Sequence, residues 1–226
     1  MADAVRTTRR SFFKRAGCVA GGIALAGVGA GVLGSRRPGF EPVSNSFAGA
    51  SATAPRVLVT YATRCGSTGE IAEEIGKALA SRGLAVDVLP LASVAGLEKY
   101  AAVVVGSAVR FGRWLPEATE FLRTRQAALA QVPTAIFTSH LFAIDDSEES
   151  RQHREAYTAP LQGLIAPRAT AFFAGKMDFS RLSFIERLMS RAVKAPEVDR
   201  RDWAAIGKWA GELTEALGVG VAPGGR

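Results

Sequence analysis

The feature that most constrains the fold of this chain is a regular alternation of short apolar runs with longer segments of helical periodicity. The short runs are rich in β-branched residues, as strands are, and the longer segments repeat apolar residues every three or four positions. The expected strands are residues 56–61, 85–89, 100–106, 134–138 and 169–174. The expected helices are residues 69–80, 116–130, about 148–165 with a kink at Pro160, 181–195 and 202–217.

This alternation predicts an α/β fold with parallel strands. Val103, Val104 and Val105 are apolar at consecutive positions, so both faces of that strand are expected to be covered. The pattern therefore predicts a doubly wound five-stranded parallel sheet with helices on both faces. Ligands bind such folds at the carboxyl ends of the strands, so we expect the functional site in the loops after residues 61, 106 and 138.

The distribution of charge argues against a nucleic-acid partner. The chain has 28 Lys and Arg and 21 Asp and Glu, a net charge of +7. Residues 1–50 hold seven of the basic and only two of the acidic groups, so +5 of this charge lies there. Residues 51–226 are nearly balanced and show no basic-aromatic pattern, so no nucleic acid is expected as a partner.

The first fifty residues have the layout of an export signal. A basic region is followed by the uncharged stretch Ala16–Gly34 and then by the small residues Ala48-Gly49-Ala50. Within the basic region, Thr8-Arg9-Arg10-Ser11-Phe12-Phe13-Lys14 resembles the twin-arginine signal, with Phe13 where that pattern has Leu. The resemblance implies export of an already folded, often cofactor-loaded protein to the periplasm or the outer face of the cytoplasmic membrane.

Two fates of this signal are compatible with the sequence. Cleavage near Ala50 would leave residues 51–226 as a single domain, with residues 1–50 as signal and linker. A retained signal would instead anchor the protein, although its stretch of 19 uncharged residues barely reaches the roughly 20 needed to cross a bilayer. After cleavage Cys65 would be the one remaining cysteine, so no intramolecular disulfide is expected.

The loop after the first expected strand has the composition of a phosphate site. It reads Thr63-Arg64-Cys65-Gly66-Ser67-Thr68 and leads into a helix, whose first N–H groups are free and whose dipole favours anions. Its three hydroxyls can donate to phosphate oxygens, and Gly66 lets the backbone curl around them. Because the loop matches neither a Walker loop nor Gly-x-Gly-x-x-Gly, a phosphate monoester is favoured. A simple helix cap at Ser67 or Thr68 is the structural alternative.

The same loop resembles the flavodoxin phosphate loop, Thr-x-Thr-Gly-x-Thr, with Cys65 in place of the middle Thr. The resemblance covers most of residues 56–217, and within the flavodoxin superfamily the chain is similar to the menaquinone-dependent protoporphyrinogen oxidase family of flavodoxin type. It is carried by the segment after the third strand, by a basic and aromatic segment after the fifth, and by Arg201-Asp202-Trp203. The resemblance implies that FMN is the cofactor and that residues 63–68 bind it.

Two further loops are expected to enclose the flavin. One wall would come from the residues that follow the third strand, namely Ser107, Ala108, Val109, Arg110, Phe111 and Gly112. Ser139 and His140 would form the other wall, where His140 could hydrogen-bond the flavin edge or serve a purely structural role. Phe111 and Trp114 are candidates for stacking on the ring, with packing at the helix entrance as the alternative for Trp114. A redox role for Cys65 is disfavoured, because a bound phosphate would destabilise its thiolate.

The resemblance also implies a donor and an acceptor. Arg110, Arg113 and Trp114 are the expected substrate contacts, since arginine pairs well with carboxylates such as the propionates of a porphyrinogen. Both arginines could equally be solvated surface side chains. The expected acceptor is menaquinone or another membrane acceptor, and the basic amphipathic segment 181–195 would contact an anionic membrane, unless it packs against the core instead. No metal site is expected.

Three functions stay open at this stage. The first is an FMN-dependent oxidoreductase that passes electrons from an organic donor through FMN to a quinone. The second is an exported flavodoxin-like electron carrier without a small-molecule substrate, and the third is a flavin-free scaffold. The nearly balanced charge of residues 51–226 argues against a carrier, because many such carriers are strongly acidic. Heme precursors are made inside the cell, so export leaves the identity of the donor open.

Overall fold

A computed structural model provides the structure of the chain and describes residues 41–192 and 197–220. The twin-arginine motif and the stretch Ala16–Gly34 lie outside the described residues. The described residues fall into two compact units, which we describe separately. The larger contains residues 41–177 and 198–220, and the smaller contains residues 178–192 and Glu197.

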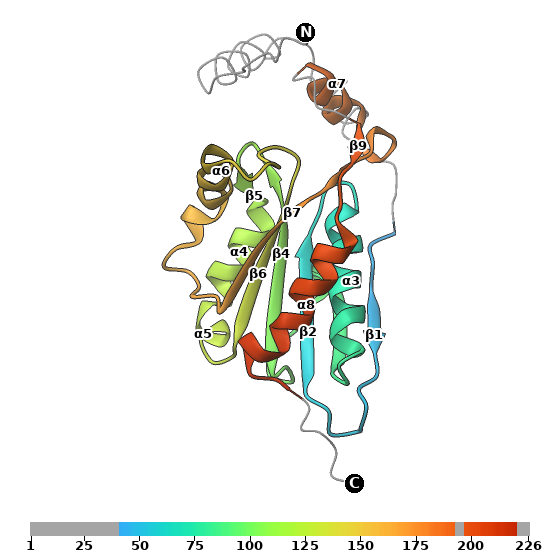
Figure 1. The fold of residues 1–226 in the computed structure, drawn as a ribbon, viewed down its shortest axis with the longest axis vertical. Coiled ribbons are helices and arrows are strands. Elements are labelled where there is room, and N and C mark those ends of the chain that lie inside the picture. The colour runs from blue at the N-terminus through green and yellow to red at the C-terminus, as the bar shows by residue number, and fades with distance from the viewer. Residues whose placement is uncertain (1–40, 193–196, 221–226) are drawn as a thin grey trace. The chain divides into compact units, whose positions relative to one another are not determined.

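The larger unit is built on a mostly parallel sheet with the strand order β1-β3-β2-β4-β6-β7 (Figure 1). The five parallel strands are β2 (Arg56–Ala62), β3 (Ala85–Pro90), β4 (Ala102–Arg110), β6 (Thr134–His140) and β7 (Ala169–Ala174). Each corresponds to a predicted strand, so the doubly wound α/β fold is confirmed. The chain runs from β2 outward to β3 and then returns to β4 on the other side of β2, so the strand order reverses between β2 and β4.

Two short antiparallel strands complete this sheet. β5 (Arg113–Trp114) folds back on the end of β4 as a hairpin. β1 (Asn45–Phe47) pairs with the outer edge of β3. Residues 45–47 were predicted to belong to the signal and linker, because they lie before the small residues Ala48-Gly49-Ala50 of the export signal. The structure therefore extends the folded unit on the N-terminal side of residue 51.

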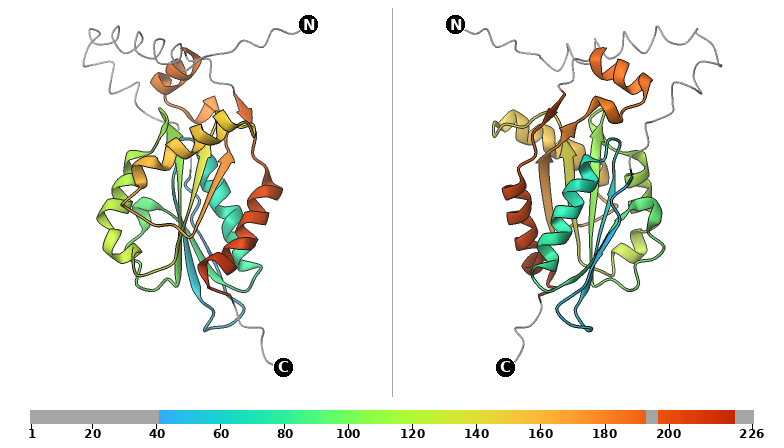
Figure 2. Two further views of the ribbon diagram at one scale, coloured as in Figure 1. Left: turned by 60° about the vertical axis from the view of Figure 1, so that its left-hand side comes forward. Right: turned by 90° about the vertical axis from the view of Figure 1, so that its right-hand side faces the viewer.

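Helices cover both faces of the sheet (Figures 1 and 2). One face is covered by α3 (Ser67–Ala80) and α8 (Trp203–Leu217). The other is covered by α4 (Pro116–Thr124) and α5 (Gln126–Leu129), with the 3₁₀ turns η1 (Leu91–Ser93) and η2 (Ala159–Leu161). α6 (Glu148–Thr158) contacts β5 and η2. Pro160 thus lies in a 3₁₀ turn after α6, where its missing N–H group ends the helix rather than kinking it.

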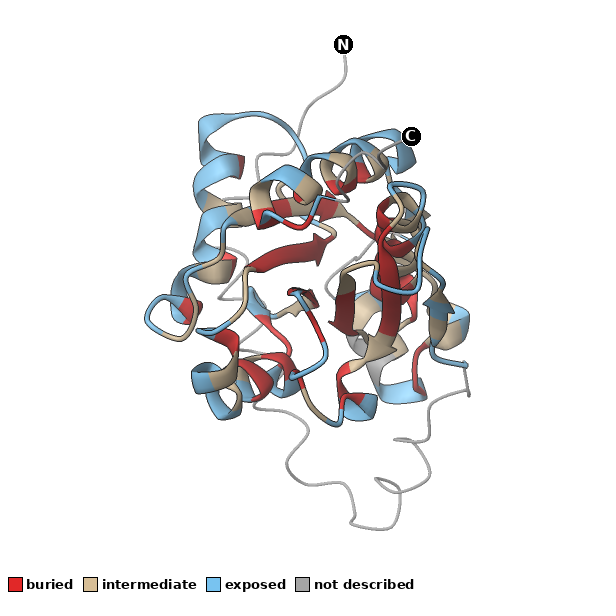
Figure 3. Ribbon diagram, turned by 90° about the horizontal axis from the view of Figure 1, so that it is seen from below, coloured by how far each residue is buried: buried red, intermediate tan, exposed pale blue. Residues whose placement is uncertain are grey.

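The two cores follow the alternation of side chains along the strands. Val57 and Val59 of β2 point into the core under α3 and α8, whereas Leu58 points into the core under α4. Seen from below, the strands are buried and the outward faces of the helices are exposed (Figure 3). The apolar character of both sheet faces, on which the fold prediction depended, is therefore explained by burial on both sides.

The smaller unit contains the turn η3 (Phe179–Arg181) and the helix α7 (Phe184–Ala192). The chain leaves the larger unit through β8 (Lys176–Met177) and returns through β9 (Val198–Asp199), and these two strands pair with each other. α7 accounts for most of the helix predicted at 181–195, of which residues 193–195 lie outside the described residues. Among the described helices, α7 included, none is both long and apolar enough to span a membrane.

Candidate functional site

The loop between β2 and α3 lies where the strand order reverses. Gly66 has a positive φ of 86° and is the N-cap of α3, with no side-chain hydrogen bond capping the helix. Gly66 N–H donates to Thr63 Oγ1 at 3.0 Å, so Thr63 closes the loop. A residue with a β-carbon would be strained at this backbone angle, which explains why glycine occupies it. The structure thus places a glycine, rather than Ser67 or Thr68, at the cap.

Ser67 and Thr68 form the first turn of α3 and are both buried. The hydroxyl oxygen of Thr68 is fully buried and has no hydrogen-bond partner in the part of the chain that the structure describes. An unsatisfied buried hydroxyl costs about 1–3 kcal/mol. The Thr68 hydroxyl lies in the first turn of α3, where the N–H groups have no acceptor within the helix. An anionic oxygen bound there would satisfy both, so these residues fit a phosphate group.

Arg64 and Cys65 form the outer part of this loop. Arg64 makes an ion pair of 2.9 Å with Glu117 in the first turn of α4, so it ties the loop to the next helix. Cys65 is partly exposed. The side chain of Arg64 is therefore engaged with a carboxylate across the site, and its direct contact with a cofactor stays a prediction.

The segment after β4 forms a hairpin with a tight turn. Phe111 and Gly112 have φ values of 53° and 75°, the left-handed conformations that two-residue hairpin turns require. Ser107 Oγ donates to the carbonyl of Ala108 at 2.9 Å and accepts from Leu115 N–H at 3.1 Å. The hydroxyl of Ser107 therefore holds the base of the hairpin, a structural role that the prediction of a cofactor contact did not include.

Aromatic and basic side chains project from the tip of this hairpin. Phe111 is 70% exposed, and the Arg110 guanidinium lies 5.0 Å from the centre of its ring. Arg113 is exposed and Arg110 is half-buried. Ala108 and Val109 lie on the strand below them and are partly buried. The hairpin thus brings Arg110, Phe111 and Arg113 to one edge of the predicted site.

Trp114 does not take the position expected for a stacking residue. Its side chain is buried, and its indole N–H donates to Thr138 Oγ1 at 2.9 Å. It packs in the core beneath α4 rather than at the surface. Trp114 therefore packs in the core, as the structural alternative expected, and its contact with the flavin or the substrate stays a prediction. The hairpin turn reverses the chain, so that Trp114 of β5 is tucked against β6 while Phe111 remains outside.

Ser139 and His140 end β6 and are both buried. His140 Nδ1 is 2.7 Å from the carbonyl oxygen of Phe142, and its Nε2 is buried without a partner among the described residues. Burial is the main cause that lowers the pKa of His140, and the nearby charges of Arg154 and His153 add to it. The bond to Phe142 opposes this shift without reversing it. His140 is therefore a neutral imidazole that donates from Nδ1.

The loop that follows, residues 141–147, is fastened from α6. Arg154 Nη1 donates to the carbonyls of Ala143 and Asp145, each at 2.7 Å. Phe142 and Ile144 stay 46% and 42% exposed in this loop. Phe142 and Ile144 were not predicted, because apolar residues in an irregular loop carry no periodic signal. Arg154 was not predicted either, because it lies on a polar helix, where arginine is usually a surface residue.

The segment Arg201-Asp202-Trp203 clamps α8 to α3. The side chain of Arg201 is only 6% exposed and forms ion pairs with Glu70 in the first turn of α3 and, at 2.6 Å, with Asp199. Asp202 caps α8 by accepting from Ala205 N–H at 2.9 Å. Because Glu70 would repel an anion at the start of α3, its pairing with Arg201 keeps that helix end suitable for phosphate.

The described residues offer no other obvious ligand chemistry. Within them, no group of three His, Cys, Asp or Glu side chains could hold a metal ion. A cavity of about 280 Å³ lies beside His140 and is lined among others by Arg154 and Phe172. This cavity lies, like the loop 63–68, at the carboxyl edge of the sheet.

A parallel sheet with this strand order, and with a strand-to-helix loop at its reversal point whose residues fit a phosphate group, defines a flavodoxin-like protein. The family model described as flavodoxin domain matches residues 58–203, and the chain belongs to that family. Protoporphyrinogen IX dehydrogenase [quinone] of Escherichia coli (strain K12) is 25% identical over 170 residues, which covers 70% of this chain and 94% of that protein.

A protein of the same name from Leishmania major is 25% identical over 184 residues, which covers 75% of this chain and 78% of that protein. Among solved structures, a flavodoxin from the domain Archaea aligns with a TM-score of 0.44 at 17% identity, over 72% of this chain and 99% of that one. The family match confirms the predicted superfamily and fold.

Proposed function

We propose that this protein is an FMN-dependent oxidoreductase that passes electrons from an organic donor through FMN to a quinone. The observation that carries the proposal is the buried, unsatisfied hydroxyl of Thr68 in the first turn of α3, directly after the left-handed Gly66. Membership of the flavodoxin-domain family supports FMN as the group that occupies this turn. The two relatives named protoporphyrinogen IX dehydrogenase [quinone] support an enzyme rather than a carrier.

The residues of this chain would bind and enclose the cofactor. FMN supplies the redox chemistry by accepting and releasing electrons. Ser67 and Thr68 would hold its phosphate together with the backbone N–H groups of α3, while Arg201 neutralises Glu70 nearby. The exposed side chains of Phe111 on one loop and of Phe142 and Ile144 on the other would provide apolar walls that exclude water from the ring.

Arg110 and Arg113 remain the proposed contacts for the donor. They flank the hairpin turn on either side of Phe111, where a planar substrate carrying carboxylates could meet both an aromatic ring and two cations. Guanidinium groups pair with carboxylates through two parallel hydrogen bonds. This chemistry suits the propionates of a porphyrinogen, which is the donor that the relatives' names suggest.

The proposed acceptor lies at a membrane, where quinones dissolve. Phe184, Ile185 and Leu188 of α7 are 71%, 40% and 57% exposed, and Arg191 near the end of the same helix is exposed too. Apolar side chains together with basic ones favour an anionic membrane surface. Export through the twin-arginine motif would put this contact at the outer face of the cytoplasmic membrane or in the periplasm.

The proposal is tested first by the spectrum and reactivity of protein purified from its own host. An oxidoreductase would show flavin absorption bands, release FMN on denaturation, oxidise protoporphyrinogen under anaerobic conditions and reduce a menaquinone analogue. A carrier would contain FMN but react with neither compound. Colourless protein that binds no added FMN would contradict both the oxidoreductase and the carrier function.

Thr68→Val tests the phosphate site directly. The substitution keeps the shape of the side chain and removes the unsatisfied hydroxyl, so FMN affinity should fall by about 5- to 30-fold, equivalent to about 1–2 kcal/mol. The apoprotein should be at least as stable as wild type, because a buried polar group has been removed. Thr124→Val, which removes a hydroxyl at the end of α4, is the matched control and should leave the affinity unchanged. Calorimetric titration of FMN and thermal unfolding of the apoproteins measure the two effects.

Replacing Phe184 and Leu188 by Ser tests the membrane contact. Protein lacking residues 1–40 should bind vesicles that contain anionic lipid, and binding should weaken with salt because charges are screened beyond about 10 Å at 0.1 M. The double variant should bind at least tenfold more weakly, since two exposed apolar side chains are lost. Ala156→Ser on α6, an exposed and uncharged position outside α7, serves as the control. Equal binding of all three proteins in vesicle flotation would contradict the membrane contact, and it would not bear on the proposed FMN site.

A further inference from the structure

Residues 43–50 form an integral edge of the sheet. Asn45, Ser46 and Phe47 pair in antiparallel register with Val88, Asp87 and Val86 of β3. From Val43 to Ala50, partly buried and exposed residues alternate as they do along an edge strand. The whole segment belongs to the same compact unit as the parallel strands.

Side chains and backbone groups fasten both ends of this segment. Tyr61 OH donates to the Val43 carbonyl at 2.8 Å, and Asn45 Nδ2 donates to Glu73 of α3 at 3.0 Å. Val43 and Phe47 pack against the core beneath α3 and α8. At the other end, Ala50 N–H donates to the Gly83 carbonyl at 2.9 Å.

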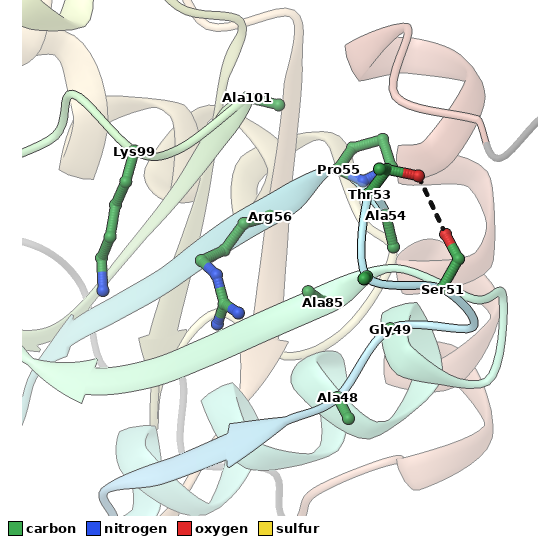
Figure 4. A pocket seen from close by; sticks show the side chains of 11 residues that line it. Ala48, Gly49, Ser51, Thr53, Ala54, Pro55, Arg56, Ala85, Lys99 and Ala101 are labelled. Carbon is green, nitrogen blue, oxygen red and sulfur yellow. Dashed lines mark hydrogen bonds between the residues drawn. The ribbon is translucent and has the colours of Figure 1, made fainter.

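The connection from β1 to β2 is also fitted closely to the sheet. Figure 4 shows Ala48–Pro55 bending past Ala85 and Arg56, where it lines a cavity of about 640 Å³. A β-carbon at Gly49 would overlap the side chain of Ala54 and lie 3.0 Å from the backbone nitrogen of Ala85. The peptide bonds around Ala50 are therefore held against β3 rather than presented as a free strand.

We infer that residues 43–50 are retained in the exported protein, so that the export signal is removed on the N-terminal side of Val43 or not at all. The inference rests on the export that the proposed function includes. A peptidase binds its substrate as an extended strand through backbone hydrogen bonds. In a protein exported already folded, the segment that leads to Ala50 is already paired with β3 through Asn45–Phe47, and Ala50 N–H is bonded to the Gly83 carbonyl. Hydrolysis after Ala50 would require β1 to detach from the sheet first.

The first experiment determines where the exported protein begins. The full chain, carrying a C-terminal tag, is expressed in a host with a twin-arginine pathway, and the exported protein is examined by intact mass and N-terminal sequencing. An N-terminus at or before Val43 supports the inference. An N-terminus between Ser44 and Ala54, as the small residues Ala48-Gly49-Ala50 suggest from the sequence, overturns it.

A second experiment tests the inference without relying on export. The full chain with Arg9→Lys and Arg10→Lys, purified from the cytoplasm, is digested with thermolysin. The resistant product should begin at or before Val43, and a stable folded product that begins after Ala50 would overturn the inference. If wild type is not exported at all, the export part of the proposed function fails, and this digestion decides the inference alone.

A matched pair of substitutions in the full chain completes the test. Phe47→Ala removes a side chain that packs against the core, so the midpoint of thermal unfolding should fall. Ala48→Ser changes the next, exposed residue and should leave the midpoint unchanged. Equal midpoints for the two variants would show that β1 does not stabilise the domain, which overturns the inference.

Discussion

His140 couples the end of β6 to the loop that follows it. Its neutral imidazole donates to the carbonyl of Phe142, while Arg154 holds the carbonyls of Ala143 and Asp145 in the same loop. The ring lies 5.8 Å from that of Tyr157, so α6 supplies both the aromatic and the cationic neighbours of His140. A proton added to this buried ring would be disfavoured by burial and by the charge of Arg154.

This arrangement predicts that the protein loses stability in mild acid. The pKa of His140 is lowered in the folded protein, so below about pH 6.5 the unfolded chain binds a proton that the folded chain does not. The contribution of His140 to the free energy of unfolding should therefore be complete above that pH and should decrease as the pH falls toward 5. In His140→Asn, whose amide can still donate to the Phe142 carbonyl, this part of the decrease should disappear.

Urea denaturation at pH 7.5 and pH 5 measures the effect. His153→Asn removes the other histidine of the chain, which is only partly buried, and serves as the control. An identical loss of stability in wild type and in His140→Asn would show that His140 is protonated without cost in the folded protein.

Single positions show where sequence reasoning succeeds and where it stops. The position of the loop 63–68 between a strand and a helix could be predicted, because the apolar run before it and the helical periodicity after it are local patterns. That this loop binds FMN stays a prediction. For Trp114 the sequence left stacking on the flavin and packing in the core both open. The burial of Trp114 depends on the two positive φ angles at Phe111 and Gly112, which set the direction in which the chain returns. The bond from Trp114 to Thr138 joins residues from different strands, and no local pattern reveals such a contact.

The parallel strands depend on close packing at a few glycines. A β-carbon at Gly106 of β4 would overlap the ring of Phe137 on β6. Gly106→Ala should therefore destabilise the protein by about 1–3 kcal/mol, as overpacking in a core usually does. Gly207→Ala in α8 is the matched control, because beyond the adjacent backbone of its own helix nothing lies within 4 Å of the added carbon.

The control should change stability in the opposite direction. Alanine in a helix interior is favoured over glycine by about 0.5–1 kcal/mol, so Gly207→Ala should stabilise the protein. Urea unfolding of both variants measures the difference. A Gly106→Ala protein as stable as wild type would mean that β4 and β6 are not packed as closely as the structure indicates.

Whole elements were predictable where their residues are apolar on both faces, and less so at the edges of the sheet. β2, β4 and β6 are covered on both sides, so their composition alone marks them as strands. β1 and β5 are two or three residues long and pair with strands already formed, so their conformation comes from the partner strand. The predicted helix at 116–130 is divided into α4 and α5 at Arg125, whose backbone φ of −106° is not helical. The side chain of Arg125 donates to the carbonyls of Val94 and Ala95.

For the molecule as a whole, Asp87 connects segments that are distant in the sequence. This buried carboxylate on β3 accepts from Ser46 of β1, Arg56 of β2, and both Lys99 and Tyr100 before β4. Burial alone would raise the pKa of Asp87, but these hydrogen bonds and the charge of Arg56 outweigh it and lower the pKa to about 2. The ionised carboxylate therefore stabilises the amino-terminal edge of the sheet, opposite the candidate functional site.

This cluster predicts a second loss of stability in strong acid. A carboxyl group with a pKa near 3.8 in the unfolded chain and about 2 in the folded one contributes about 2 kcal/mol above pH 4, and this contribution is lost as the pH falls through 2. In Asp87→Asn the protein should be less stable than wild type at pH 7 by at least that amount, because Arg56 and Lys99 lose their partner. The difference should shrink between pH 4 and pH 2, where wild type becomes protonated at Asp87.

Glu98→Gln, an exposed neighbour, controls for the change in net charge. Urea unfolding across this pH range decides the question, since a difference that stays constant down to pH 2 would mean that the ionisation of Asp87 is not what holds these strands together.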